Sequence, residues 1–208
     1  MSGDPDTEQR IREAAFRALA EHGYTALTLG DIGDELGQNP SLIYHYFDSK
    51  DELLLSMLDV FVELFVGERA DEPVDDPVTE LRAVVEQLLH PAPEQVERMM
   101  DSPPADIETA MSRVFVELWA HATWDDDFRA ATTAVEARVR ETITRILRAG
   151  IERGEFRPVD PELTADHLFF LLKQGIHTRT TTNWETATER AAAIADAVVD
   201  DLSLDDRR

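Results

Sequence analysis

The sequence predicts an all-α protein, and three observations point to that class. Apolar residues recur three and four positions apart through most of the chain. Capping residues precede these stretches, and prolines or glycines follow them. No alternation of period two, the pattern of a half-buried strand, persists anywhere. With 208 residues, 43% of them hydrophobic, the chain can bury a substantial core as one domain or two small ones.

The first predicted helix covers residues 7–21, and Gly23 is expected to end it. A second helix follows, with Thr28 as its N-cap, Asp31 answering in a capping box, and Gly37 ending it in a left-handed conformation. Asn39 is a suitable N-cap and Pro40 suits the first position of a helix, which together predict another short helix. The apolar side of the first helix is formed by Ile11, Ala14, Ala15, Phe16 and Leu19.

The two short helices joined by a tight turn match a helix-turn-helix, whose second helix enters the major groove of DNA. Ile43 and Phe47 are spaced to face inward, which leaves the rest of the segment mainly on the other side, namely Ser41, Leu42, Tyr44 and His45. An ordinary helical hairpin has the same periodicity, so the pattern alone does not separate the two interpretations. Ser49 and Glu52 form a capping box that opens a third, longer helix, expected from residue 50 to about 70.

Residues 31–54, DIGDELGQNPSLIYHYFDSKDELL, resemble the signature of the TetR family of transcriptional regulators. The specific part is Tyr-His-Tyr-Phe at 44–47 followed by Ser49 and Lys50. This resemblance implies a three-helix DNA-binding domain over residues 1–52 and an effector-binding and dimerisation domain over residues 53–208. The expected function is a transcriptional regulator, in particular a repressor that a small-molecule effector releases from its operator. The other matching positions are Thr28, Asp31, Ile32, Gly37, Ile43, Glu52 and Leu53.

Eight residues are candidates for DNA contact, by this resemblance and by side-chain chemistry. Hydroxyl, imidazole and ammonium groups are expected to meet phosphates, and the start of the second short helix is expected to meet base edges. Many family members carry a hydroxyl residue where this chain has an apolar one, Leu42, so phosphate contacts contribute a smaller share here. The candidates are Thr28, Tyr44, His45 and Lys50 for phosphates, and Asn39, Pro40, Ser41 and Leu42 for bases.

The net charge of −23 is unusual for a protein that binds DNA. Acids outnumber bases by 43 to 20, and Lys50 and Lys173 are the only lysines. Three explanations compete: the chain does not bind DNA, it concentrates its cations on one face, or it works in concentrated salt that screens its self-repulsion. The acidic, lysine-poor composition resembles that of proteins from halophiles, and we favour the third explanation.

The rest of the chain predicts helices at about 77–90, 93–101, 104–122, 125–153, 160–180 and 184–202. Residues 111–131 and 146–176 resemble the C-terminal domain of the betaine-synthesis-repressor branch of the TetR family, which binds a small effector and dimerises. In the family the last two helices form a four-helix bundle with a second copy. The expected partners are therefore a homodimer mate, a near-palindromic double-stranded operator and an unidentified effector.

A stripe of methionine and aromatic residues suggests an effector pocket, although plain hydrophobic core gives the same pattern. Trp119 and Trp124 have the chemistry of a cage for a quaternary ammonium group. Lys173 is expected to meet an anionic effector or to pair with a neighbouring acid. The candidates are Met99, Met111, Phe115, Trp119, Trp124, Phe128, Phe169, Phe170 and Lys173.

Several classes of function receive no support from the sequence. The absence of cysteine excludes disulfides and thiolate sites. No apolar run is long enough to span a bilayer, so a cytoplasmic protein is expected. Glu117 and His121 are one helical turn apart, but a metal site needs a third ligand. No nucleophile has a base and an orienting group in a recognised pattern, so neither an enzyme nor a cofactor is expected. The main alternative is a small-molecule-binding protein whose helix-turn-helix is vestigial.

Overall fold

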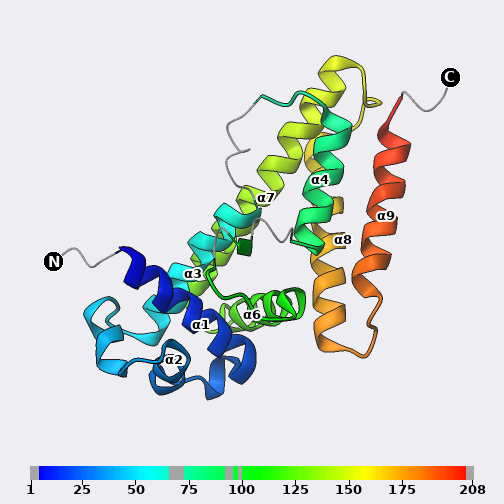
Figure 1. Ribbon diagram of the computed structural model, residues 1–208. Helices are drawn as coiled ribbons and strands as arrows, with labels where there is room; N and C mark the ends of the chain where they lie inside the picture. The colour runs from blue at the N-terminus through cyan, green and yellow to red at the C-terminus, as the bar shows by residue number, and fades with distance from the viewer. Residues whose placement is uncertain (1–4, 66–72, 92–95, 98–99, 205–208) are drawn as a thin grey trace. The chain divides into compact units, whose positions relative to one another are not determined.

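The computed structural model describes residues 5–65, 73–91, 96–97 and 100–204. These residues are almost entirely helical (Figure 1), as predicted, and the β-type pairing among them is a single bridge between Phe156 and Ser203. In chain order the helices are α1 (Pro5–Ala26), α2 (Leu29–Leu36), the 3₁₀ helix η1 (Pro40–His45), α3 (Lys50–Phe65), α4 (Pro77–Leu89), α6 (Ile107–His121), α7 (Asp126–Arg153), α8 (Pro161–Thr181) and α9 (Ala187–Leu202).

The chain divides into two compact units. Unit 1 contains Met1–Leu64 and Pro93–Val135, and unit 2 contains Phe65–Ala92 and Glu136–Arg208. Helix α6 and the first part of α7 therefore group with the N-terminal helices, although they are remote from them in sequence. The functional boundary at residues 52 and 53 remains a prediction.

Helix α1 is the central element of unit 1 and packs against α2 and α6. Its predicted apolar side is buried, with Ile11 and Leu19 fully inaccessible to solvent. Gly23 has a φ of 70° and a ψ of 160°, so it kinks the chain instead of ending the helix. Beyond the kink the helix continues to Ala26, where the Leu27 N–H donates to the Gly23 carbonyl at 3.0 Å.

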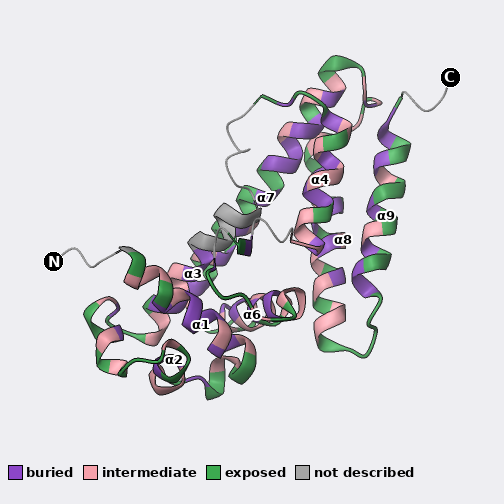
Figure 2. Ribbon diagram, in the orientation of Figure 1, coloured by how far each residue is buried: buried purple, intermediate pink, exposed green. Residues whose placement is uncertain are grey.

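Unit 2 contains a tight pair of helices, α8 and α9, with α4 packed against both. Figure 2 shows the buried residues along the facing sides of these helices. Gly175 of α8 allows the close approach, since a Cβ atom there would lie 2.6 Å from the Cβ of Ala191. The core of unit 2 includes Leu81, Val85, Ile143, Leu147, Leu168, Leu172 and Val199.

The segment Gly154–Pro158 connects α7 to α8 and is held against the end of α9. Gly154 has a φ of 74°, the left-handed conformation that commonly ends a helix, and it follows the last residue of α7. Arg157 donates its N–H to the Leu202 carbonyl at 2.8 Å, and Leu204 donates to the Glu155 carbonyl at 2.9 Å. Phe156 is buried between these contacts. The segment Gly154–Pro158 therefore links the end of α7 to the end of α9.

The structure defines three predicted helices more closely, and two other predicted segments lie partly outside the described residues. The second helix of the helix-turn-helix, predicted only as a short helix, is a 3₁₀ helix of six residues, Pro40–His45. Helix α6 begins at Ile107 because Asp106 caps it, accepting from the Thr109 N–H at 3.0 Å. Helix α9 begins at Ala187 rather than residue 184. Most of the helix predicted at 93–101, and the end of the one predicted to residue 70, lie outside the described residues.

Candidate nucleic-acid interface and effector cavity

The helix-turn-helix is fixed by local capping that the sequence predicted. The Thr28 hydroxyl accepts from the Asp31 N–H at 3.3 Å, and the Asp31 carboxylate accepts from the Thr28 N–H at 2.7 Å. Gly37 ends α2 with a φ of 66°. The Asn39 side-chain oxygen accepts from the Ser41 N–H at 2.9 Å and caps η1. These contacts set the direction of η1 relative to α2.

The polar side of η1 is turned to solvent, as predicted. Ile43 is fully buried and Phe47 is 5% exposed, so these two side chains hold the 3₁₀ helix against unit 1. Tyr44 is 59% exposed. Among the remaining DNA-contact candidates, Thr28, Asn39, Ser41 and His45 are exposed, and Pro40, Leu42 and Lys50 are partly buried.

Lys50 is engaged within unit 1. Its ammonium donates to the Tyr24 carbonyl at 2.9 Å and to the Leu27 carbonyl at 3.0 Å, and it lies 4.2 Å from the centre of the Tyr24 ring. Three donors are available on an ammonium, so a phosphate contact would use the third. The structure thus assigns Lys50 a structural role in addition to the predicted contact with DNA.

Tyr24 connects the end of α1 to α3 and α6. Its hydroxyl donates to Asp51 at 2.7 Å, and its N–H donates to Glu117 at 3.0 Å. Its ring stacks on His121 with centroids 3.7 Å apart. Burial, and then the hydrogen bond to Asp51, raise the pKa of the Tyr24 phenol well above its usual range. Glu117 and His121, considered as a metal pair in the sequence, are thus contacts of Tyr24.

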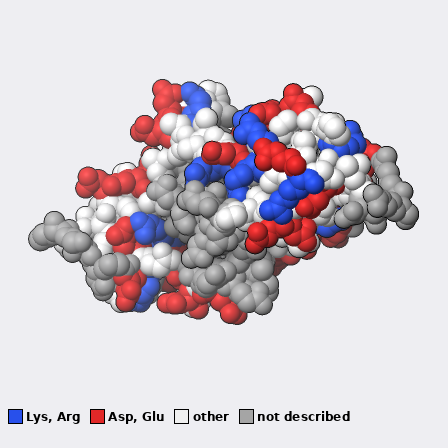
Figure 3. Space-filling model, turned by 90° about the horizontal axis from the view of Figure 1, so that it is seen from above, with Lys and Arg blue, Asp and Glu red and all other residues white. Residues whose placement is uncertain are grey.

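Cations near the helix-turn-helix are few, and two of them are paired. Arg12 bonds to Glu8 and to Ser56, and Arg17 bonds to Glu35 at 3.0 Å. On the face drawn in Figure 3, acidic and basic side chains are interspersed rather than separated into large areas of one sign. The structure therefore supplies exposed hydrogen-bonding groups at η1, while Arg12 and Arg17 are engaged by neighbouring side chains.

The predicted effector-pocket residues divide between the two units. In unit 1 Met111 is buried, Phe115 and Trp119 stack with centroids 3.8 Å apart, and Phe128 is fully buried against Tyr24 and His121. Trp124 is 89% exposed, which leaves one wall of the predicted tryptophan cage in solvent.

In unit 2 Phe169 is buried and Phe170 is 62% exposed. Lys173 forms an ion pair with Glu136, one of the two roles predicted for it. Met99 lies outside the described residues. Most of the candidates therefore lie either in the hydrophobic core or on the surface. That they line a shared effector pocket remains a prediction.

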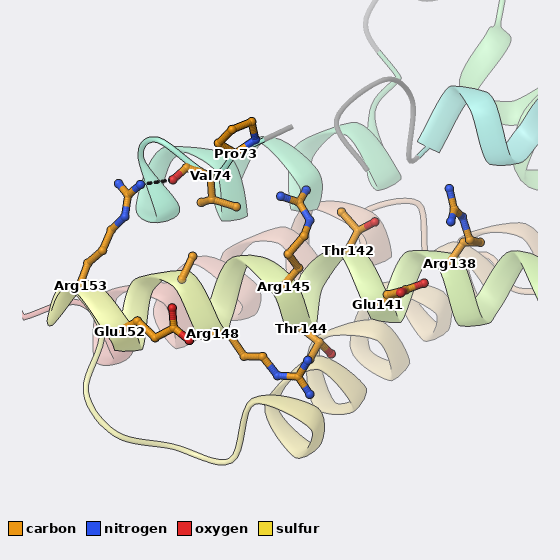
Figure 4. A pocket seen from close by; sticks show the side chains of 11 residues that line it. Pro73, Val74, Arg138, Glu141, Thr142, Thr144, Arg145, Arg148, Glu152 and Arg153 are labelled. Carbon is orange, nitrogen blue, oxygen red and sulfur yellow. Dashed lines mark hydrogen bonds between the residues drawn. The ribbon is translucent and has the colours of Figure 1, made fainter. Parts of the chain in front are cut away.

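Unit 2 contains a cavity of about 830 Å³ that the sequence reasoning did not identify (Figure 4). The charged residues of α7 that line it are spaced as on any solvated helix face, so the sequence does not indicate that they line a cavity. The only available signal was the density of arginine in a lysine-poor chain. The lining residues are Pro73, Val74, Arg138, Glu141, Thr142, Thr144, Arg145, Arg148, Ala149, Glu152 and Arg153.

Comparison with protein families places these features in a known group. Residues 11–57 match the family described as bacterial regulatory proteins, tetR family, and residues 77–204 match the BetI-type transcriptional repressor C-terminal family. The chain belongs to the TetR family of transcriptional regulators. This TetR-family chain therefore carries both parts of such a regulator, the helix-turn-helix and the C-terminal domain.

Curated relatives agree with the assignment. The HTH-type transcriptional regulator BetI of Rhizobium meliloti is 33% identical over 55 residues, which are 26% of this chain and only about a quarter, 27%, of BetI. The HTH-type transcriptional repressor KstR2 of Rhodococcus jostii is 24% identical over 163 residues, which cover 78% of this chain and 74% of KstR2.

Solved structures share the fold over nearly the whole chain. A TetR transcription regulator from Haloarcula marismortui superposes with a TM-score of 0.80 at 26% identity, over 96% of this chain and all of that one. A putative transcriptional regulator from Saccharomonospora viridis in complex with choline superposes with a TM-score of 0.76 at 23% identity, over 95% and 97% of the two chains. The second likeness shows a common fold and leaves the ligand of this chain open.

Two features are absent from the part of the chain that the structure describes. None of its helices combines the length and apolar character needed to cross a membrane. No three His, Asp or Glu side chains within it gather closely enough to hold a metal ion.

Proposed function

We propose that this chain is a DNA-binding repressor that acts as a homodimer on a near-palindromic operator and is released by a small-molecule effector. The observation that carries the proposal is the solvent-facing polar side of η1 on a fully capped helix-turn-helix. A hairpin with only a structural role would not need to leave Ser41, Tyr44 and His45 exposed together while burying Ile43 and Phe47.

Base recognition would come from the start of η1. The Asn39 side-chain oxygen is engaged by the Ser41 N–H, but its NH₂ group remains a donor toward a base edge. Leu42, partly exposed, suits contact with a thymine methyl group. Tyr44 and His45 suit phosphate oxygens on either side. These roles use hydrogen bonds and apolar contact rather than net charge.

The net charge of −23 sets the conditions in which this recognition would operate. At molar salt the Debye length falls to about 3 Å, so repulsion between the acidic surface and the phosphates is confined to direct neighbours. Counterion release then contributes little to affinity, and shape and hydrogen bonding must contribute more. We infer an intracellular environment rich in salt, consistent with the acidic composition.

Dimerisation would use the outer faces of α8 and α9. Leu163 is 68% exposed, and Phe170 and Ile194 are also exposed, which is unusual for large apolar side chains on two neighbouring helices. A two-fold dimer would present two η1 helices to half-sites about one helical turn of DNA apart. The effector would act by binding more tightly to the dimer geometry that does not match the operator.

A gel-shift titration tests the proposal. The purified chain is mixed with DNA from upstream of its own gene over KCl concentrations from low to molar, with an unrelated fragment as competitor. We expect a specific complex that persists at high KCl. Failure to form a complex at any salt concentration would favour the alternative, a small-molecule-binding protein with a vestigial helix-turn-helix.

A further inference from the structure

The cavity of unit 2 is locally basic in a strongly acidic chain. Four arginines and two glutamates line it, which gives its lining a formal charge of +2, whereas the whole chain carries −23. The chain has only 20 lysines and arginines, and four of them, one fifth, line this cavity. Two of the four arginines also form ion pairs with acids outside the lining, Arg148 with Glu162 and Arg153 with Glu155. The positive charge of the lining itself favours anions.

The two walls of the cavity come from α7 and from the segment before α4. Arg153 donates to the carbonyls of Val74 and Asp75 and so ties this segment to the end of α7. Val74 and Thr142 of the lining are buried. Figure 4 shows Arg145 and Thr142 on the side of α7 that faces Pro73 and Val74. The cavity is thus built by contacts within unit 2.

The arginines are spread along α7 at intervals that suit an elongated ligand. With a rise of about 1.5 Å per residue, Arg138 and Arg148 lie roughly 15 Å apart along the axis. Arg145 lies between them and is partly buried. Arg148 pairs with Glu162 of α8 and so belongs to the rim. A volume of about 830 Å³ falls within the range of small-molecule sites.

We propose that this cavity is the effector site and that its ligand is an organic anion bearing phosphate or carboxylate groups. Guanidinium groups match both groups with paired N–H donors. A quaternary ammonium ligand would be repelled by the same lining. The inference rests on the proposed function only in calling the ligand an effector; the binding of an anion to the cavity is tested independently of DNA.

Calorimetry with two anions and one cation tests the site. Pyrophosphate and citrate separate phosphate from carboxylate recognition, and choline is the cation. Titrations are done at the lowest KCl concentration at which circular dichroism shows a folded chain, because screening weakens charge contacts. We expect at least one anion to bind and choline not to bind. Binding of choline alone, or of none of the three, would overturn the proposal.

Three variants locate the binding. Arg138→Gln with Arg145→Gln removes two lining cations and should weaken anion binding about tenfold or more. Glu141→Gln with Glu152→Gln removes two lining anions and should strengthen it several-fold. Arg113→Gln, a change of the same kind at an exposed position of α6, is the matched control and should not alter it. The gain expected from the glutamate variant cannot arise from misfolding, so unchanged affinity there contradicts the site.

A second arm tests the effector role in the gel shift. A saturating concentration of the bound anion should reduce DNA affinity of the wild-type chain and leave the arginine variant unaffected at the same concentration. If the anion binds as expected and the DNA complex does not change, the cavity is not the effector site. If the chain never binds DNA, the proposed function fails, and calorimetry alone then decides whether the cavity binds anions.

Discussion

At the scale of single residues, unit 1 depends on side chains that bond to backbone at the junction of α1, α2 and α3. Lys50 satisfies two carbonyls there, and Tyr24 bridges to Asp51 and Glu117. The family signature includes Lys50, and phosphate contact is the role expected for it. The structure shows that the same ammonium also closes the fold, which a sequence pattern does not reveal because the accepting carbonyls carry no side-chain signal.

Lys50→Met tests this structural role. Loss of two charge-assisted hydrogen bonds leaves the Tyr24 and Leu27 carbonyls without that donor and should destabilise the chain by about 2 kcal/mol. Urea unfolding followed by circular dichroism at fixed KCl measures the change, with Arg113→Met as the matched control. Wild-type stability in Lys50→Met, combined with weaker DNA binding, would indicate that Lys50 serves DNA alone.

Asp31 predicts a dependence of stability on acid pH. Its hydrogen bonds with Thr28, from the hydroxyl first and the N–H second, hold the pKa of the carboxyl below its usual range. A lowered folded-state pKa contributes stability above the unfolded value, about 3.9, that is lost as pH falls through the folded value. Asp31→Asn should therefore flatten the loss of stability below pH 4 in an acid titration. An identical acid profile for both proteins would contradict the capping role.

At the scale of elements, the sequence predicted the helix caps well and predicted tertiary partners poorly. Thr28, Gly37 and Asn39 fix their helix ends through bonds to neighbours in the chain, so their pattern is readable from the sequence. The sequence did not predict that η1 is a 3₁₀ helix. Over six residues, the apolar side chains needed on the buried side have nearly the same spacing in a 3₁₀ helix as in an α-helix. The cavity was missed because enclosure depends on the segment before α4 lying against α7, which no local pattern specifies.

The contact between α8 and α9 depends on one small residue. A methyl group added at Gly175 would lie 2.6 Å from the Cβ of Ala191, closer than side-chain carbons approach. Gly175→Ala should therefore destabilise the chain by about 1–3 kcal/mol, the cost of overpacking, although alanine favours helix.

Ala191→Gly in the same chain provides the control for this contact. It removes the opposing methyl group and should recover part of the stability lost in Gly175→Ala, a coupling that a double-mutant cycle by thermal unfolding measures. Additive effects of the two substitutions would show that the helices adjust without strain.

At the scale of the whole molecule, a net charge of −23 must be reconciled with binding to a polyanion. The exposed polar groups of η1 favour the proposed recognition of DNA by hydrogen bonds and shape. The proposed homodimer would contribute, because each half-site would add its own contacts without further basic residues. Affinity and oligomeric state are therefore expected to vary together.

Phe170→Asp tests the dimer. Phe170 is 62% exposed on α8, so the change should leave the subunit folded while placing a charge in the proposed interface. Sedimentation equilibrium in high KCl should show a dimer for the wild type and a shift toward monomer for the variant, with Leu204→Asp, exposed beyond α9, as the comparison. A wild type that remains monomeric would contradict the proposed assembly.

The most direct measurement of the central claim is fluorescence anisotropy with the upstream DNA fragment and Ser41→Glu. Ser41 is exposed on η1, so a carboxylate there leaves the fold intact and meets the DNA. We predict that the wild type binds specifically in high KCl and that Ser41→Glu lowers its affinity by about tenfold or more at unchanged thermal stability. Equal affinities for the two proteins would contradict recognition through η1.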